Sequence, residues 1–469
     1  MSRLTRTALA AHTGTSAAPA PVRIAHLGLG AFFRAHQAWY TDVVDAGNEW
    51  GIRAFTGRSP EAAVPLAEQD GLFTLIEKSD AGDSFRIMDS IVDAADGARM
   101  DLFAETIAAP ETELLTLTIT EAGYTVEGAG RLARDAPGVA EDVAMLRDVV
   151  RAATLDVSQA PRTALARTLL ALEARRRAGT GPFTIVPCDN LPDNGTLMRA
   201  ALSALAEHVG SADLLSYVRS DVSYVGTSID RITPATTPAD TAAVAATTGW
   251  EDLAPVVTEP FTSWILSDNL RCERPRWEEV GALVVADLEP FEQRKLWLLN
   301  GTHSLMAYTG LLRGRTTIAE AIADPTISGW VEELWDEACR SLPAEGLDLP
   351  GYRAALRSRY ENSSIQHFVA QIGLDGVMKL RIRAVPVLKA ERAAGREGTG
   401  ALRALAAWVA LAQAGELPAD RSEAEVREAA AEPDSVRALL AVLDPELAED
   451  SALAAQVREL AAELAAERS

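Results

Sequence analysis

Three polar side chains with catalytic potential stand close together in an otherwise apolar stretch. Lys295, Asn300 and His303 belong to the segment KLWLLNGTHSLMAY, 295–308. At about 100° per residue, an α-helix places them at about 0°, 140° and 80° around its axis, within one arc. We expect that arc to face an apolar interior, where burial lowers the pKa of a lysine until it becomes a usable general base. The alternative is a lysine that extends to solvent.

Lysine is scarce in this chain, which gives each lysine more weight. The sequence has 44 Lys plus Arg residues, of which only four are lysine. A guanidinium cannot lose its proton near neutral pH, whereas a lysine amine can. A lysine among polar groups in an apolar stretch therefore indicates proton transfer, although drift is the simpler explanation for any single one. The four are Lys78, Lys295, Lys379 and Lys389.

A glycine turn near the N-terminus has features of a dinucleotide site. The run VRIAHLGLG, 22–30, reads as a strand that ends in Gly28-x-Gly30, and helical periodicity follows over 31–47. Glycines let such a turn approach a pyrophosphate, and a helix N-terminus offers free N–H groups. Phe33 stands where a small residue is usual, so we expect the helix to lie farther from the strand. An ordinary strand-to-helix turn is the alternative.

The residue after the second predicted strand bears on the choice of cofactor. That strand, GIRAFTG at 51–57, is followed by Arg58 before any acidic residue. An acid there would bond the ribose 2′-hydroxyl of NAD, whereas an arginine suits the 2′-phosphate of NADP. We predict NAD and keep NADP as an alternative, since Arg58 also reads as a plain surface charge.

A further polar group follows a predicted strand at 182–190. The sequence CDNLPDNG, 188–195, stands at the end of that strand, and α/β sheets bind ligands at the carboxyl ends of their strands. The amide of Asn190 or Asn194 can donate to a substrate oxygen or accept from a hydroxyl. A turn built from Asn, Pro and Gly fits the same residues.

The order of strands and helices predicts an α/β chain in two parts. Residues 1–21 have basic and small residues without a continuous apolar core, which predicts a mobile tail. Strand-like runs alternate with helical segments over 22–288, and the run at 283–290 reads as the last strand. Helical patterns dominate from 289 to 469. We therefore expect an α/β domain followed by an all-helical domain.

Composition argues against several kinds of partner. The chain has 469 residues, 67 of them acidic and 44 basic, so its formal charge is −23. Such a surface repels phosphate backbones and anionic membranes, so we expect neither nucleic acid nor membrane as a partner. Three scattered cysteines indicate a reducing cytoplasm, and the six histidines form no zinc motif, so we predict no metal. Nothing requires a partner chain, so we expect a monomer.

These motifs resemble the mannitol dehydrogenase family of long-chain, zinc-independent polyol and sugar-acid dehydrogenases. The resemblance spans most of the chain, from 22 to about 410. A family signature that more often reads VDRI has isoleucine in place of valine here. The matching segments are HLGLGAFFRAHQAWYTD at 26–42, TITEAGY at 118–124, CDNLPDNG at 188–195, SIDRITP at 228–234, EPFTSWILSDNL at 259–270 and KLWLLNGTHSLMAY at 295–308.

The resemblance implies a fold and a set of roles. It implies a Rossmann-type domain with a mostly parallel sheet over 22–288 that binds the dinucleotide, and a helical domain that binds substrate and carries catalysis. It also implies that Lys295 is the general base, that Asn300 and His303 hold the reacting oxygen, and that Asn190 is a second oxygen partner. The expected cofactor contacts are Leu27, Gly28, Gly30, Ala31, Phe32, Arg58 and Thr120.

Two branches of the family compete for the substrate. One interconverts mannitol and fructose, and the other mannonate and fructuronate. The segment HFVAQIGLDGVMKLRIR, 367–383, is more similar to the sugar-acid branch, HRTxQIAxDGSQKLPxR, although Phe368 replaces the usual arginine. A carboxylate substrate needs a cation, which Lys379, Arg381 or Arg383 would supply. The predicted substrate contacts are Asn194, Lys379 and Arg383.

The sequence therefore predicts a cytoplasmic NAD(P)-dependent oxidoreductase that acts on a small open-chain sugar acid or sugar alcohol, with D-mannonate and D-fructuronate as the preferred pair. One alternative is a mannitol 2-dehydrogenase or another polyol dehydrogenase. A non-enzymatic alternative is a sensor that binds NAD(H), which would have no need of the Lys–Asn–His set.

Overall fold

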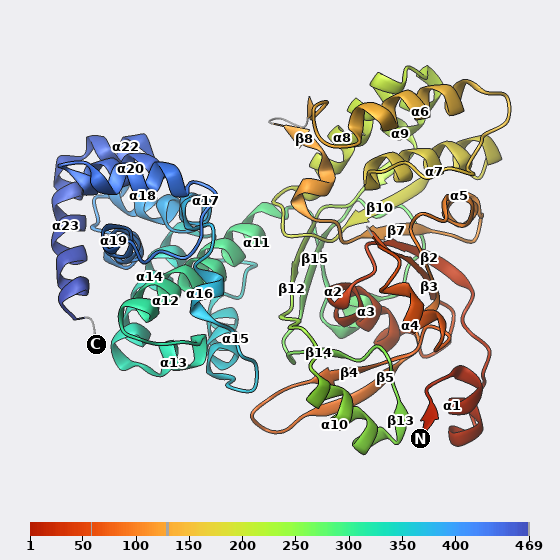
Figure 1. The fold of residues 1–469 in the computed structure, drawn as a ribbon, viewed down its shortest axis with the longest axis horizontal. Coiled ribbons are helices and arrows are strands. Elements are labelled where there is room, and N and C mark those ends of the chain that lie inside the picture. The colour runs from red at the N-terminus through yellow and green to blue at the C-terminus, as the bar shows by residue number, and fades with distance from the viewer. Residues whose placement is uncertain (58, 128–130, 468–469) are drawn as a thin grey trace. The chain divides into compact units, whose positions relative to one another are not determined.

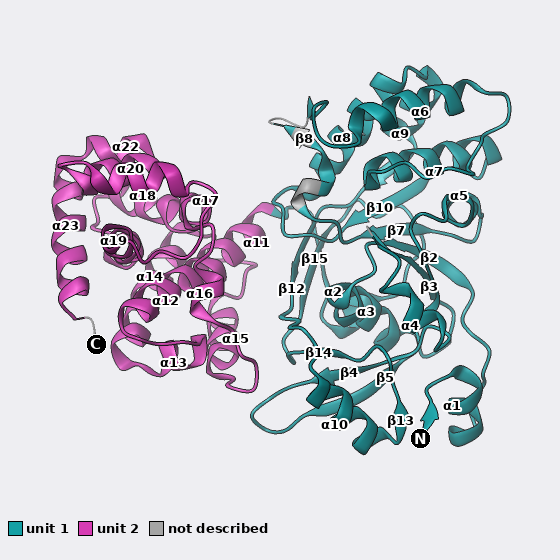
Figure 2. Cartoon of the chain, viewed as in Figure 1, with its two compact units in different colours: residues 1–288 teal, residues 289–469 magenta. Residues whose placement is uncertain are grey.

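The computed structural model describes residues 1–57, 59–127 and 131–467 (Figure 1). The chain forms two compact units, Met1–Leu288 and Glu289–Ser469 (Figure 2). Arg58, which was predicted to contact the cofactor, lies outside the described residues.

A six-stranded parallel sheet forms the centre of the first unit, as predicted. Its strand order is β11-β10-β7-β2-β3-β6, and every neighbouring pair is parallel. Because β2 lies between β7 and β3, the direction of winding reverses beside β2, and α/β sheets bind ligands at such a point. These strands are β2 (Val22–Leu27), β3 (Gly51–Phe55), β6 (Ile91–Ala95), β7 (Leu114–Leu117), β10 (Phe183–Pro187) and β11 (Val222–Tyr224).

Helices cover both faces of this sheet because its strands are apolar on both sides. Ala25 and Leu27 of β2 belong to one core and Ile24 to the other, as the alternation of a strand requires. The first core includes residues of α5 (Met100–Ala108), α6 (Val139–Arg151), α7 (Ala164–Ala178), α8 (Asn194–Val209) and α9 (Ala212–Ser220). The second includes residues of α2 (Ala31–Ala35), α3 (Gln37–Val44) and α4 (Ala63–Ala67).

The remaining strands of the first unit form small separate sheets. The run 283–290, predicted as the last strand, forms β16 (Leu283–Val285), which pairs with β15 in a three-stranded sheet β12-β15-β16. Another sheet has the order β14-β4-β5. The other elements of this unit are β4 (Phe73–Glu77), β5 (Ser84–Met88), β8 (Val126–Glu127), β9 (Arg131–Leu132), β12 (Thr227–Asp230), β14 (Val256–Thr258), β15 (Ser263–Ser267), α10 (Pro238–Thr248), η1 (Glu121–Tyr124) and η2 (Trp277–Val280).

The N-terminal segment is built into the first unit, so the predicted mobile tail over 1–21 is wrong. β1 (Ser2–Arg3) pairs in parallel with β13 (Trp250–Glu251), and α1 (Arg6–Thr13) follows. Leu4 is fully buried against Leu72 and Trp250. A single anchoring leucine between polar residues has no periodic signal, which explains why the sequence did not predict this attachment.

The second unit is all helical, as predicted. α12 (Gly301–Leu312) and α19 (Thr399–Ala414) are buried along nearly their whole length and pack against each other. The others are α11 (Glu289–Arg294), η3 (Lys295–Asn300), α13 (Ile318–Ala323), α14 (Pro325–Ser341), α15 (Leu349–Glu361), α16 (Val369–Ile372), α17 (Gly376–Arg383), α18 (Val385–Ala393), α20 (Glu423–Ala431), α21 (Ser435–Leu443), α22 (Pro445–Glu449) and α23 (Ser451–Ala466).

The attachment of the N-terminal segment is testable by removing its anchor. Leu4→Ala should lower the free energy of unfolding by about 2–4 kcal/mol, because it leaves a cavity against Leu72 and Trp250. Chemical denaturation would measure the change, with Leu253→Ala, at a side chain that is 39% exposed, as the control. Equal stability of the Leu4→Ala and Leu253→Ala proteins would show that the segment is detached in solution.

Candidate active site

The glycine turn after β2 lies where the winding of the sheet reverses. Gly28 has a φ of +116°, and a Cβ there would stand 2.3 Å from the carbonyl oxygen of Thr118. Thr118 follows β7, and its hydroxyl donates to the Gly28 carbonyl at 2.8 Å. Glycine is therefore required at position 28, where it joins the carboxyl ends of the two central strands.

The residues after this turn fit a phosphate-bearing group. A Cβ at Gly30 would meet nothing nearer than the Gly28 carbonyl oxygen at 3.6 Å. α2 has no side-chain cap, so the N–H groups of Ala31 and Phe32 in its first turn have no acceptor within the helix. Leu27 is fully buried in the core, so only its backbone reaches this turn, whereas Thr120 is exposed after β7.

A histidine accommodates the large residue in the glycine motif. The ring of Phe33 is fully buried and stacks on His26 of β2, with 3.4 Å between ring centroids. Burial lowers the pKa of His26 to about 3, so the imidazole is neutral, and its nitrogens bond the hydroxyls of Thr116 and Thr118. Aromatic stacking thus replaces the close helix–strand approach that a small residue would give.

The side chain of Asn194 anchors the CDNLPDNG loop to the backbone of Thr227. This side chain is fully buried; its amide donates to the Thr227 carbonyl at 3.1 Å and accepts from the Thr227 N–H at 2.9 Å. Asp189 accepts from the Tyr124 hydroxyl and from the Leu191 N–H. Asn190, between them, is exposed at the end of β10. Asn194 therefore holds the loop that carries Asn190, and the predicted contact of Asn194 with substrate is corrected.

The segment that carries Lys295 is not the uniform α-helix assumed in the sequence analysis. Residues Lys295–Asn300 form a π-helical turn, η3, and the N–H of Gly301 donates to the carbonyl of Leu296, five residues back. Lys295 and Asn300 are half-buried rather than enclosed in an apolar interior, while Leu298 and Leu299 face the core. The polar ends of η3 thus bracket an apolar turn.

His303 lies one turn farther along, buried among cations. It is 7% exposed, and its Nε2 has no hydrogen-bond partner among the described residues. Its ring contacts those of Tyr360 and His367, with centroids 5.0 Å away in each case. Burial, with the nearby positive charges of His367, Arg359, Arg383 and Lys379, holds the pKa of His303 well below its usual value. The imidazole is therefore neutral at working pH.

The predicted carboxylate-binding cations separate into two groups. Arg383 donates to the Ser304 hydroxyl at 3.1 Å and to the Asn300 carbonyl at 3.4 Å, so it lies against η3 and α12. Lys379 is half-buried and donates to the Ile372 carbonyl. Burial and the charge of Arg383 lower the pKa of Lys379 to about 8. Arg381 instead donates to carbonyls of α21 and is not in this group.

The structure groups the predicted residues by unit. Asn300, His303 and Arg383 come together around η3 and α12, while Asn190 and Asn194 belong to the first unit. Three neighbours of His303 were not predicted: Arg359, Tyr360 and His367. Of these three, only His367 could have been predicted from the sequence, because it begins the segment 367–383 that resembles the sugar-acid branch.

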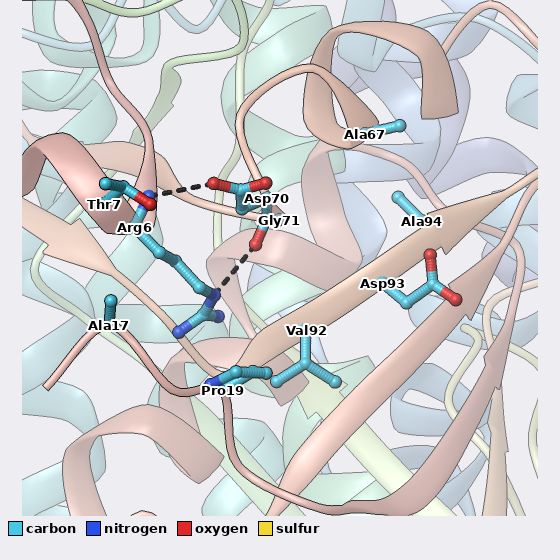
Figure 3. A pocket seen from close by; sticks show the side chains of 10 residues that line it. All are labelled: Arg6, Thr7, Ala17, Pro19, Ala67, Asp70, Gly71, Val92, Asp93 and Ala94. Atoms are coloured by element: carbon cyan, nitrogen blue, oxygen red, sulfur yellow. Dashed lines mark hydrogen bonds between the residues drawn. The ribbon is translucent and has the colours of Figure 1, made fainter.

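The described residues show no second group of candidate site residues at the cavity and no metal-binding cluster. A cavity of about 360 Å³ in the first unit is lined by Arg6, Asp70 and Asp93, among others, and contains none of the predicted site residues (Figure 3). Within the described ranges, no helix is long and apolar enough to cross a membrane. Over the same residues, no group of three or more His, Cys, Asp or Glu side chains is arranged to hold a metal ion.

Comparison with known proteins assigns both units to one family. Residues 22–279 match the family model of the mannitol dehydrogenase Rossmann domain, and residues 287–465 match that of the mannitol dehydrogenase C-terminal domain. The D-mannonate oxidoreductase of Escherichia coli is 33% identical over 403 residues, which cover 83% of this chain and 80% of that protein. A mannitol 2-dehydrogenase of Cereibacter sphaeroides is 34% identical over 399 residues, covering 82% and 80%.

A solved structure shares the whole architecture. The mannitol 2-dehydrogenase of Pseudomonas fluorescens, in a ternary complex with NAD and D-mannitol, is 32% identical. It covers 95% of this chain and 92% of its own, with a TM-score of 0.78. Both units are therefore matched in sequence and in fold, and the chain belongs to the mannitol dehydrogenase family of oxidoreductases.

Proposed function

We propose that this protein is an NAD-dependent oxidoreductase that interconverts an open-chain sugar acid and its keto form, with D-mannonate and D-fructuronate as the preferred pair. The similarity to the D-mannonate oxidoreductase of Escherichia coli supports this choice, and the similarity to mannitol 2-dehydrogenases makes mannitol and fructose the competing pair.

The observation that carries the sugar-acid proposal is a pair of cations without an ion pair. Among the described residues, neither Lys379 nor Arg383 has a carboxylate within salt-bridge distance, although both act on the buried His303. Elsewhere in this unit, half-buried arginines have such partners; Arg353 and Arg357 both pair with Glu332. Asp375 and Asp420 act on Lys379 only from beyond ion-pair distance. Because a cation shielded from water is costly without a contacting partner, two of them near the proposed reacting oxygen favour an anionic substrate.

The side chains around η3 suit alcohol–ketone interconversion. NAD bound at the glycine turn would supply the hydride acceptor for the oxidation of a substrate hydroxyl. The proton of the substrate hydroxyl that is oxidised passes to the Lys295 amine. The carbon that bears this hydroxyl loses two electrons with the hydride, and the product is a ketone. Neutral His303 offers to the reacting oxygen its Nε2, which has no partner in the described part of the chain, and Asn300 is a second partner. Asn190 is proposed as a further partner of that oxygen.

The test of the overall proposal is a cofactor-oxidation assay with purified protein. NADH and NADPH are each combined with fructose, fructuronate and tagaturonate, and absorbance reports the reduced cofactor. We expect the highest kcat/KM with NADH and fructuronate. A higher kcat/KM for fructose would move the protein to the polyol branch, and no turnover with any ketose would favour an NAD(H) sensor.

Replacement of Lys295 tests the general base. Lys295→Ala should lower kcat for oxidation by about 10²–10⁴, the usual contribution of a positioned base, and should abolish the loss of activity at low pH. Lys295→Arg should be nearly as poor, because a guanidinium keeps the charge but cannot deprotonate. His303→Ala should cost less, since its depressed pKa leaves it neutral.

The competing assignment makes His303 the base and Lys295 only electrostatic. It predicts that Lys295→Arg stays within about tenfold of wild type while His303→Ala loses the pH dependence. Steady-state pH profiles of both variants decide between the two assignments.

The charge of Lys379 gives a test of substrate class. Its pKa is lowered to about 8, so the amine is cationic below that pH and neutral above it. The KM for fructuronate should therefore rise as pH increases through about 8, and Lys379→Arg should move that rise to higher pH. Lys379→Met should cost about 2–4 kcal/mol in kcat/KM for fructuronate and little for fructose, which has no charge.

Arg381→Met is the matched control on the same helix, because that guanidinium is bound to α21. Arg381→Met should leave kcat/KM unchanged for both fructuronate and fructose. If Lys379→Met reduced kcat/KM equally for fructuronate and fructose, Lys379 would be structural and the sugar-acid proposal would lose its basis.

The glycine turn gives a test of the cofactor site. Gly30 has extended backbone angles and space for a side chain, so Gly30→Val should fold. The valine should nevertheless raise the Kd for NADH more than about tenfold by filling the approach to the first turn of α2. Fluorescence titration measures the Kd and thermal unfolding checks the fold. Unchanged NADH affinity in a stable Gly30→Val protein would refute the assignment.

A further inference from the structure

The π-helical turn η3 interrupts the four-residue hydrogen-bond spacing between α11 and α12. Gly301 donates to Leu296, five residues back, whereas the residues of α12 follow the usual four-residue spacing. The carbonyls of Leu298 and Leu299 lie at this change from five-residue to four-residue spacing, where additional donors can fix the geometry. π-helical turns are rare, well under about 1% of residues, so this one requires a local cause.

Three buried side chains supply donors to this turn. The Trp335 indole, on α14, donates to the Leu298 carbonyl at 2.9 Å. The Tyr360 hydroxyl, on α15, donates to the Leu299 carbonyl at 3.2 Å. The Thr302 hydroxyl lies within 3.2 Å of both carbonyls and 2.8 Å from the Tyr360 oxygen. Each of the three side chains is at most 2% exposed, so water does not compete for these bonds.

The π-turn changes the direction of the two polar residues at its ends. With about 4.4 residues per turn, residues five apart differ by about 50° around the axis, against about 140° in an α-helix. Lys295 and Asn300, which are five apart, therefore share one face only while η3 keeps its π geometry. The Tyr360 ring also packs on His303, with 5.0 Å between centroids. One set of bonds thus sets the direction of all three residues.

We propose that Trp335, Thr302 and Tyr360 are positioning residues that hold η3 in π geometry and thereby align Lys295 with Asn300 and His303. This inference rests on the catalytic roles proposed above. None of the three need touch substrate or cofactor, because each acts through the carbonyls of Leu298 and Leu299. Loss of a donor allows the segment to relax toward α-helical spacing, which turns Lys295 away from Asn300.

Thr302 offers the sharpest test, because its hydroxyl and its methyl group can be removed separately. Thr302→Val keeps the shape and loses the donor, whereas Thr302→Ser keeps the donor and loses a methyl group. We expect Thr302→Val to lower kcat about tenfold, the cost of about one hydrogen bond, with the KM for NADH unchanged. Thr302→Ser should restore most of the rate. A purely packing role predicts the opposite order of the two variants.

A matched control lies on the same helix. Thr309 is also fully buried on α12, and its hydroxyl bonds the Leu305 carbonyl in an ordinary helical turn. Thr309→Val should keep kcat within about twofold of wild type. Trp335→Phe should lower kcat more than Trp408→Phe, because the Trp408 indole nitrogen has no hydrogen-bond partner among the described residues.

Amide hydrogen exchange gives a readout that does not depend on turnover. Peptides that span 295–301 should exchange faster in Thr302→Val than in wild type or Thr309→Val. If Thr302→Val matches wild type in kcat and in exchange while Lys295→Ala is inactive, the positioning inference fails and the proposed base stands. If Lys295→Ala retains wild-type turnover, the proposed base fails, and with it the inference that these bonds align a catalytic group.

Discussion

The structure depends most on the requirement that buried backbone N–H and C=O groups find partners. At η3, side chains from α12, α14 and α15 donate to the carbonyls of Leu298 and Leu299 at the change in helical spacing. In the CDNLPDNG loop, the Asn194 amide takes both the N–H and the carbonyl of Thr227. At the N-terminus, the Arg6 guanidinium donates to the carbonyls of Asp89 and Ile91. In each case a polar side chain is used to hold irregular backbone in one conformation.

Long-range and local electrostatics act in opposite directions on an anionic substrate. A formal charge of −23 repels a carboxylate, but free salt screens that repulsion beyond about 8 Å under physiological conditions. The cations near His303 act at shorter range and in a less polar medium, where each charge has more effect. Attraction is therefore confined to the neighbourhood of η3 and α12, which favours a small acid over a polyanion.

The regular parts of the fold could be predicted because their signals are periodic. The apolar runs of β2 and β7 and the glycine turn between β2 and α2 predicted an α/β domain, and the spacing of Lys295 and His303 marked them as candidate site residues. The π geometry was not predictable, because four consecutive apolar residues separate Lys295 from Asn300 and carry no helical period. Arg359 had no distinguishing signal among so many arginines. Asn194 was misassigned because a loop amide that binds backbone looks the same in sequence as one that binds substrate.

The scarcity of lysine has a consequence for covalent labelling. An amine attacks an acylating or aldehyde reagent only in its unprotonated form. Hydrogen bonds to Asp444 and Glu446 raise the pKa of Lys389, so at neutral pH that amine stays protonated. The amine of Lys379, with its pKa lowered to about 8, is partly unprotonated under the same conditions. Amine-directed reagents should therefore modify Lys379 well before Lys389, and a bound sugar acid should protect it.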